Sequence, residues 1–119
     1  MIQVTPCKLI TCIVPNDGTD RTLLRALRTD VQIIRANSLQ VRGLAILAGA
    51  KLKHGEIPKN VMVRMVTVVV DEEQANQVFD YICEKANIGR PGGGSVSMSG
   101  SVTATAYLLP EGVPDEEQA

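Results

Sequence analysis

Two β-α-β patterns of similar length follow one another along this chain, and this order leaves few folds open to it. The expected elements are a strand at residues 8–14, a helix at 20–29, a strand at 33–47, a strand at 61–70, a helix between Asp71 and Asn87, and a strand at 96–106. A ferredoxin-like split βαβ sandwich is the natural arrangement of these elements. The sequence therefore predicts an α+β fold (βαββαβ) with one antiparallel sheet and two helices on one face.

Apolar spacing and capping residues define the two helices. The first helix places Leu23, Leu24 and Leu27 on one face. Asp71 is positioned to cap the second helix, with Gln74 as its capping-box partner. The second helix carries one apolar stripe, formed by Ala75, Val78, Phe79, Ile82 and Ala86. Both helices are therefore expected to pack one face against a sheet.

The two strands of the second half have different patterns. The almost continuous apolar run at residues 61–70 predicts a central strand that is buried on both faces. The strict alternation over residues 96–106 predicts one half-buried strand with a hydroxyl-lined outer face. A sheet with helices on one face only needs a cover on the other, and we expect another subunit to provide it.

Composition sets the broad class. The chain has 119 residues, enough for one domain (residues 1–110) followed by a short acidic tail (111–119). Twelve basic and thirteen acidic residues leave a net charge of −1, so no global field attracts nucleic acid. No secretory signal or membrane-spanning run is recognised, which predicts a cytoplasmic protein. The three cysteines have no CxxC spacing, so they are expected to be reduced and mostly buried, without a metal.

The stretch Gly-Arg-Pro-Gly-Gly-Gly-Ser at residues 89–95 is the strongest candidate binding site. Three consecutive glycines permit positive φ, and successive N–H groups can then point into one concavity that binds an anion. Arg90 would add positive charge to this phosphate or carboxylate cradle. The alternative is a flexible connection. No Gly-Lys-Ser/Thr follows, and the next element is a strand, which excludes a Walker loop.

Other polar residues do not form a catalytic motif. His54 is the only histidine, and it lies in a segment at residues 48–60 whose Gly, Lys and Pro content predicts an exposed loop. The serines at alternate positions of the last strand are best explained as its polar face. Lys51 and Lys53 either solubilise the loop or dock on an acidic partner. We therefore predict a binding protein and no enzyme.

Residues 8–109 resemble the PII-type nitrogen-regulatory signalling proteins. The opening Lys-Leu-Ile-Thr-Cys-Ile-Val resembles the first strand of that family, and Val-Arg-Gly at 41–43 resembles the start of its T-loop. Ile-Pro-Lys at 57–59 resembles the motif that returns from the T-loop. The most specific match is residues 68–96, which keep the strand, helix, glycine-rich B-loop and following strand in order.

The resemblance implies a homotrimer with effector sites between subunits. It implies adenine nucleotides (AMP, ADP or ATP) as ligands, with a small anion such as 2-oxoglutarate or bicarbonate. It also implies a T-loop that reports ligand state to a membrane transporter or metabolic enzyme. The expected ligand-binding residues are Arg42, Gly43, Arg64, Gly89, Arg90, Gly92, Gly93, Gly94 and Ser95, and the expected docking residues are Lys51, Lys53 and His54.

Several positions depart from the family pattern. Ser95 stands where the B-loop of the family has a phosphate-binding Lys, and Ala106 and Leu108 stand near its two Arg positions. Leu47 replaces the T-loop Gln, and the segment 48–60 contains no Tyr or Ser to modify. With so few cations, AMP or ADP is favoured over ATP. The alternative function is a metal-handling or enzymatic trimer on the same fold, for which no His/Cys cluster is recognised.

Overall fold

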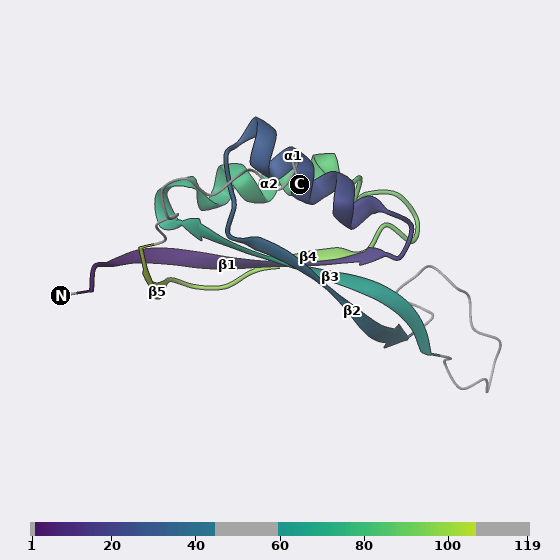
Figure 1. Cartoon of the computed structure of the whole chain (residues 1–119). Coiled ribbons are helices and arrows are strands. Elements are labelled where there is room, and N and C mark those ends of the chain that lie inside the picture. Colours follow the sequence, from purple (N-terminus) through teal and green to yellow (C-terminus); the bar gives the residue numbers. More distant parts are fainter. Residues whose placement is uncertain (1, 45–59, 107–119) are drawn as a thin grey trace, which may run out of the picture.

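The structure, a computed structural model, describes residues 2–44 and 60–106. Figure 1 shows a single layer of strands with two helices above it. The elements in chain order are β1 (Val4–Pro15), α1 (Thr19–Asp30), β2 (Ala36–Leu44), β3 (Asn60–Asp71), a 3-10 turn (Glu72–Gln74), α2 (Ala75–Lys85), β4 (Ser95–Met98) and β5 (Val102–Thr105). The predicted order of strands and helices is confirmed. The start of β2 lies three residues later than expected, and residues 45–47 lie outside the described residues.

The sheet is antiparallel and has the strand order β2-β3-β1-β4, with β5 also paired to β1. The long strands β1 and β3 occupy the centre, where Ile10 faces Val68 and Cys12 faces Val66. Both helices lie on the same face of the sheet. This arrangement confirms the ferredoxin-like α+β fold.

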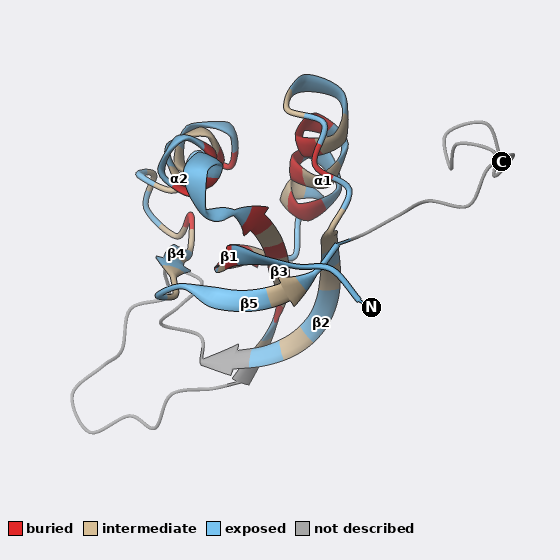
Figure 2. Cartoon of the chain, turned by 90° about the vertical axis from the view of Figure 1, so that its left-hand side faces the viewer, coloured by how far each residue is buried: buried red, intermediate tan, exposed pale blue. Residues whose placement is uncertain are grey.

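The core lies between the helices and the sheet and is largely aliphatic. Figure 2 shows buried residues on the helices and on the central strands. The largest fully buried side chains are Ile10, Leu23, Leu27, Ile82, Val14, Val66, Val68, Cys7 and Cys12. All three cysteines are free, as expected, and burial followed by the charge of Cys83 raises the pKa of Cys12 to about 11. Cys12 therefore acts as a small apolar core residue.

Two sequence expectations about these elements are wrong, and one is met in part. β3 is central, as predicted, but within the single chain it is fully buried on one face only: Val66 and Val68 pack on the core, whereas Met65 and Val69 on the other face are half-buried. The reason is that both helices lie on one side of the sheet, so burial of the second face by a partner subunit stays a prediction. Asp71 makes no side-chain capping hydrogen bond, so the predicted capping box is absent at this position. A 3-10 turn provides the entry to α2 instead.

The predicted continuous strand at 96–106 is the second error. β4 pairs with residues 10–13 of β1 and β5 pairs with residues 4–7, and Ser99 lies at the break between them. The Leu9 N–H donates to Ser99 Oγ at 2.9 Å, and the Ser99 N–H donates to the Leu9 carbonyl at 2.9 Å. A side-chain oxygen thus takes the place of a backbone acceptor, and the strand is divided in two.

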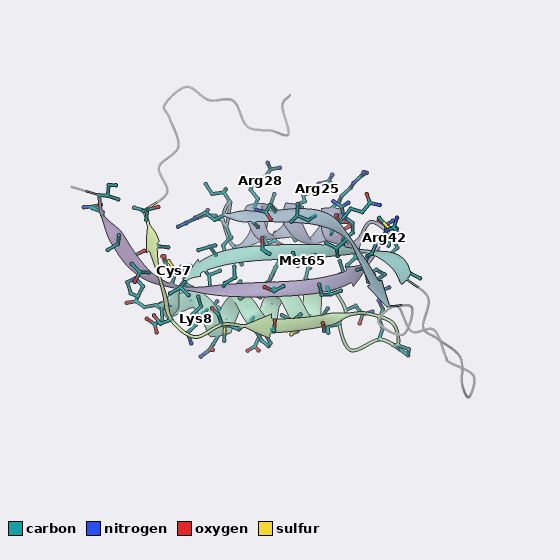
Figure 3. The ribbon with its side chains drawn as sticks, turned by 90° about the horizontal axis from the view of Figure 1, so that it is seen from below. Cys7, Lys8, Arg25, Arg28, Arg42 and Met65 are labelled. Carbon is teal, nitrogen blue, oxygen red and sulfur yellow. The ribbon has the colours of Figure 1, made fainter. Side chains whose placement is uncertain are left out.

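The face of the sheet opposite the helices carries an apolar row. The register places Leu39 opposite Met65, and Met65 opposite Ile13, so these three side chains form a row across β2, β3 and β1. Leu39 is 53% exposed. Figure 3 looks onto this face, with the helices behind the sheet and Met65 in the central strand. No described helix covers this row.

Candidate functional site: the glycine loop and the start of α1

The glycine loop, residues 88–95, has two residues in the left-handed region of backbone space. Gly92 has φ 72° and Gly94 has φ 98°, whereas Gly93 does not have a positive φ. The Gly93 N–H donates to the Arg90 carbonyl at 3.0 Å, which closes a turn at the tip of the loop. Within the described residues, the N–H groups of Gly92 and Gly94 donate to no backbone oxygen. The positive φ of two of the three glycines agrees with the sequence expectation, and the binding of an anion by these two amides stays a prediction.

Close packing explains the glycines as well. A Cβ atom at Gly93 would lie 2.7 Å from the Asn87 carbonyl oxygen and 2.8 Å from Cγ of Arg90. A Cβ atom at Gly94 would overlap the Ile13 carbonyl oxygen and lie 2.8 Å from its carbon. Gly93 thus permits the tight turn itself, and Gly94 permits the loop to rest on the backbone of β1.

Arg90 connects the loop to the start of α1. Its Nη2 lies 3.3 Å from Asp17 Oδ2 and 3.2 Å from Thr19 Oγ1. The Asp17 carboxylate also accepts the Thr19 N–H at 3.1 Å, next to the N-cap residue Gly18. The hydrogen bond from the Thr19 hydroxyl lowers the pKa of Asp17 below its ordinary value. Burial opposes this effect, and the positive charge of Arg90 adds to it. The Asp17 carboxylate therefore accepts hydrogen bonds both from the start of α1 and from Arg90.

Arg64, on β3, belongs to a second polar cluster at the same helix end. Its Nε lies 3.0 Å from Asp20 Oδ2 and 3.1 Å from Ser38 Oγ, and the Ser38 hydroxyl donates to Asp20 Oδ2 at 2.7 Å. Asp20 is only 6% exposed. Burial acts to raise the pKa of Asp20, but the Ser38 hydrogen bond and the Arg64 charge outweigh it and lower that pKa.

Arg64 is predicted from the sequence as a ligand residue, whereas its two partners, Asp20 and Ser38, are not. The available signals were a charged residue within an apolar strand and an Asp in the first turn of a helix. The structure joins them because α1 crosses the sheet over β2 and β3, and the contacts between α1 and these two strands place Asp20 over Ser38 and Arg64. Arg64 is thus a structural cation at the edge of the candidate site.

The remaining predicted ligand residues lie on β2, in the first part of the glycine loop and at the start of β4. Arg42 lies on β2 opposite Met62, with an exposed side chain, and Gly43 is opposite Val61. Within the described residues, no hydrogen bond or ion pair joins Arg42 to the glycine loop. A Cβ atom added at Gly89 would meet nothing within 4 Å, and Ser95 is exposed as the first residue of β4. Lys51, Lys53 and His54 lie outside the described residues.

The candidate site therefore consists of the Gly92 and Gly94 amides and the Arg90–Asp17 pair, next to the more deeply buried Arg64–Asp20 pair. A cavity of about 410 Å³ lies elsewhere, lined by Thr5, Pro6, Asp71, Glu72 and Glu73, and it contains none of the predicted ligand residues. In the described part of the chain, no group of three or more His, Cys, Asp or Glu residues is placed to hold a metal ion. None of the helices in these residues is long and apolar enough to cross a membrane.

Comparisons with known proteins identify the fold. No family model matches the sequence, and no curated protein matches it. A structure of Arabidopsis thaliana PII bound to citrate aligns with a TM-score of 0.58 at 21% identity, covering 79% of this chain and 73% of that one. The B. subtilis GlnK–ATP complex aligns with a TM-score of 0.62 at 13% identity, covering 82% of this chain and 83% of the other. The resemblance expected from the sequence is thus matched by tertiary structure: the chain has the fold of the PII proteins, in a divergent form.

Proposed function

We propose that this chain is a PII-like regulatory signal-transduction protein. It binds a small anionic effector at the glycine loop, between subunits, and docks on a membrane transporter or metabolic enzyme through residues 48–60, with Lys51, Lys53 and His54 as contacts. The observation that carries the proposal is the glycine loop itself, where two positive-φ glycines with available amides lie beside Arg90 at the start of α1. Backbone amides and a helix start together favour negative charge.

The charge around the loop favours a ligand with few negative charges. The two structural neighbours were solved with citrate and with ATP, so this fold accommodates carboxylate and phosphate ligands in those proteins. In this chain, however, Arg64 and Arg90 are each paired to an aspartate. We therefore propose AMP or ADP, or a small anion such as 2-oxoglutarate or bicarbonate, in preference to ATP.

Replacement of Gly93 by Val is expected to abolish anion binding, while the homotrimer is retained. The new side chain would collide with the Asn87 carbonyl and with Arg90, so the turn must rearrange, whereas the contact with β1 is made by Gly94. Calorimetry with AMP, ADP, ATP, 2-oxoglutarate and bicarbonate measures the binding of parent and variant. Gly100→Ala is the control, because an added Cβ at Gly100 meets nothing within 4 Å and the residue lies outside the glycine loop.

Unchanged binding in Gly93→Val would place the site elsewhere on the molecule. Absence of binding of all five compounds by the parent protein would contradict the effector-sensing function. A partner-docking protein without an effector would then be the better description.

The uncovered apolar row on the sheet is expected to be an interface in a homotrimer. Leu39, Met65 and Ile13 form a row that no described helix covers, and burying it against other copies removes apolar surface from water. Light scattering is expected to give three times the chain mass of 12.8 kDa. Met65→Lys is expected to shift the protein to monomer, since an unpaired ammonium would lie in the middle of this row.

Lys8→Ala is the control for this variant, because it changes a half-buried residue of β1 away from the row. A monomer mass for the parent protein at micromolar concentration would contradict the trimer. A Met65→Lys variant that keeps the parent mass would contradict the placement of the interface on this row.

A further inference from the structure

The ion pair between Arg90 and Asp17 lies inside the proposed anion site. Arg90 is the one cation that belongs to the glycine loop, and its Nη2 is already directed at the Asp17 carboxylate. The same carboxylate accepts hydrogen bonds from the Thr19 N–H and the Thr19 hydroxyl. Asp17 therefore occupies the donors that a phosphate or carboxylate ligand would use at this end of α1.

We propose that the Asp17 carboxylate is an internal ligand of the glycine loop, which an effector anion displaces from Arg90 when it binds. This inference rests on the proposed function, and it specifies how the site is regulated. Asp17 sets the affinity by competition. The displacement lowers the affinity for every anion that contacts Arg90.

The geometry of the pair makes it exchangeable. Asp17 reaches Arg90 through Nη2 alone, at 3.3 Å, whereas strong charge-assisted hydrogen bonds measure about 2.7–2.9 Å. Arg90 Nε is buried and has no hydrogen-bond partner among the described residues. The two side chains are 36% and 46% exposed, so water screens their attraction. The pairing with Asp17 is thus incomplete, and displacing the carboxylate costs little.

The neighbouring pair is built differently. Asp20 is almost fully buried and is held by both Ser38 and Arg64, which fixes its carboxylate in place. Separating Asp20 from Arg64 would leave the buried Asp20 carboxylate without a charged partner, which would destabilise the fold. Arg90 is therefore the cation that the effector recruits, and Arg64 stays with Asp20 in both states.

Asp17→Asn tests the competition directly. The Asn oxygen can still accept the Thr19 N–H, so the turn before α1 is kept while the charge that holds Arg90 is lost. We expect this variant to bind inorganic phosphate and AMP up to about fivefold more tightly than the parent, the upper limit for an exposed ion pair. Glu73→Gln is the control, since it removes the same charge at the opposite end of α2 from the glycine loop. It should change the affinity by less than about twofold.

An NMR titration of the protein without ligand complements the calorimetry. In the parent protein, Arg90 helps to lower the pKa of Asp17, so Arg90→Gln is expected to raise that pKa in an NMR titration. Tighter binding in Asp17→Asn together with this rise supports the inference. Binding by Asp17→Asn when the parent binds nothing measurable also supports it.

Two other results would overturn the inference, and they differ in what they say of the proposed function. Equal or weaker binding in Asp17→Asn, with clear binding by the parent, overturns the competition and leaves the effector site intact. Absence of binding by the parent and by Asp17→Asn overturns the proposed effector site, and the competition with it.

Discussion

Gly94→Ala is expected to destabilise the fold by about 4 kcal/mol or more, the range of the most damaging single substitutions. Gly94 has φ 98°, and an added Cβ would overlap the carbonyl of Ile13 in the central strand β1. The backbone of a paired central strand cannot move aside, because both neighbouring ladders hold it. The loss should appear in urea unfolding as a large decrease in the free energy of unfolding, or as failure to fold.

Gly100→Ala is the matched control for this prediction. Gly100 lies in the gap between β4 and β5, with nothing within 4 Å of an added Cβ. The free energy of unfolding of Gly100→Ala should stay within about 1 kcal/mol of the parent value, in either direction. Parent-like stability in Gly94→Ala would show that the loop does not rest on β1 in the way described above.

Arg64→Met is expected to lower the free energy of unfolding by about 3 kcal/mol at pH 7, since it leaves the buried Asp20 carboxylate without its charge partner. Met keeps most of the side-chain volume, so the effect reports the interaction with Asp20. Arg25→Met, on the exposed face of α1, is the control and should change stability by less than about 0.5 kcal/mol. Urea unfolding at matched protein concentration measures both variants.

The same pair predicts a pH dependence with a definite sign. The pKa of Asp20 in the folded protein is lowered from the ordinary value of 3.8, so the pair contributes stability fully above that value. The contribution is lost as the pH falls through the lowered pKa. The difference between parent and Arg64→Met should therefore be largest near neutral pH and should shrink in acid. A difference that is constant with pH would mean that Asp20 does not carry the effect.

The sequence by itself determined the order of the elements and the inward faces of the helices, since these follow from spacing within a few residues. Leu23 and Leu27 on α1, and Val78 and Ile82 on α2, recur at the helical period and are buried as predicted. The glycine run also predicted a loop with positive φ between α2 and β4. In each case the physical cause is local, either a side-chain period or the missing Cβ of glycine.

Tertiary structure decided which polar groups meet. Arg90 is 73 positions from Asp17, and Arg64 is 44 from Asp20 and 26 from Ser38, so no local pattern connects them. The break between β4 and β5 is similar, because residues 96–106 alternate without interruption, whereas in the folded chain Ser99 bonds Leu9 at the place where pairing with β1 is interrupted. Periodicity reports which face of an element is buried. The partners of a charge are set by how the elements pack, and that is why the aspartates beside both arginines emerged only from the folded chain.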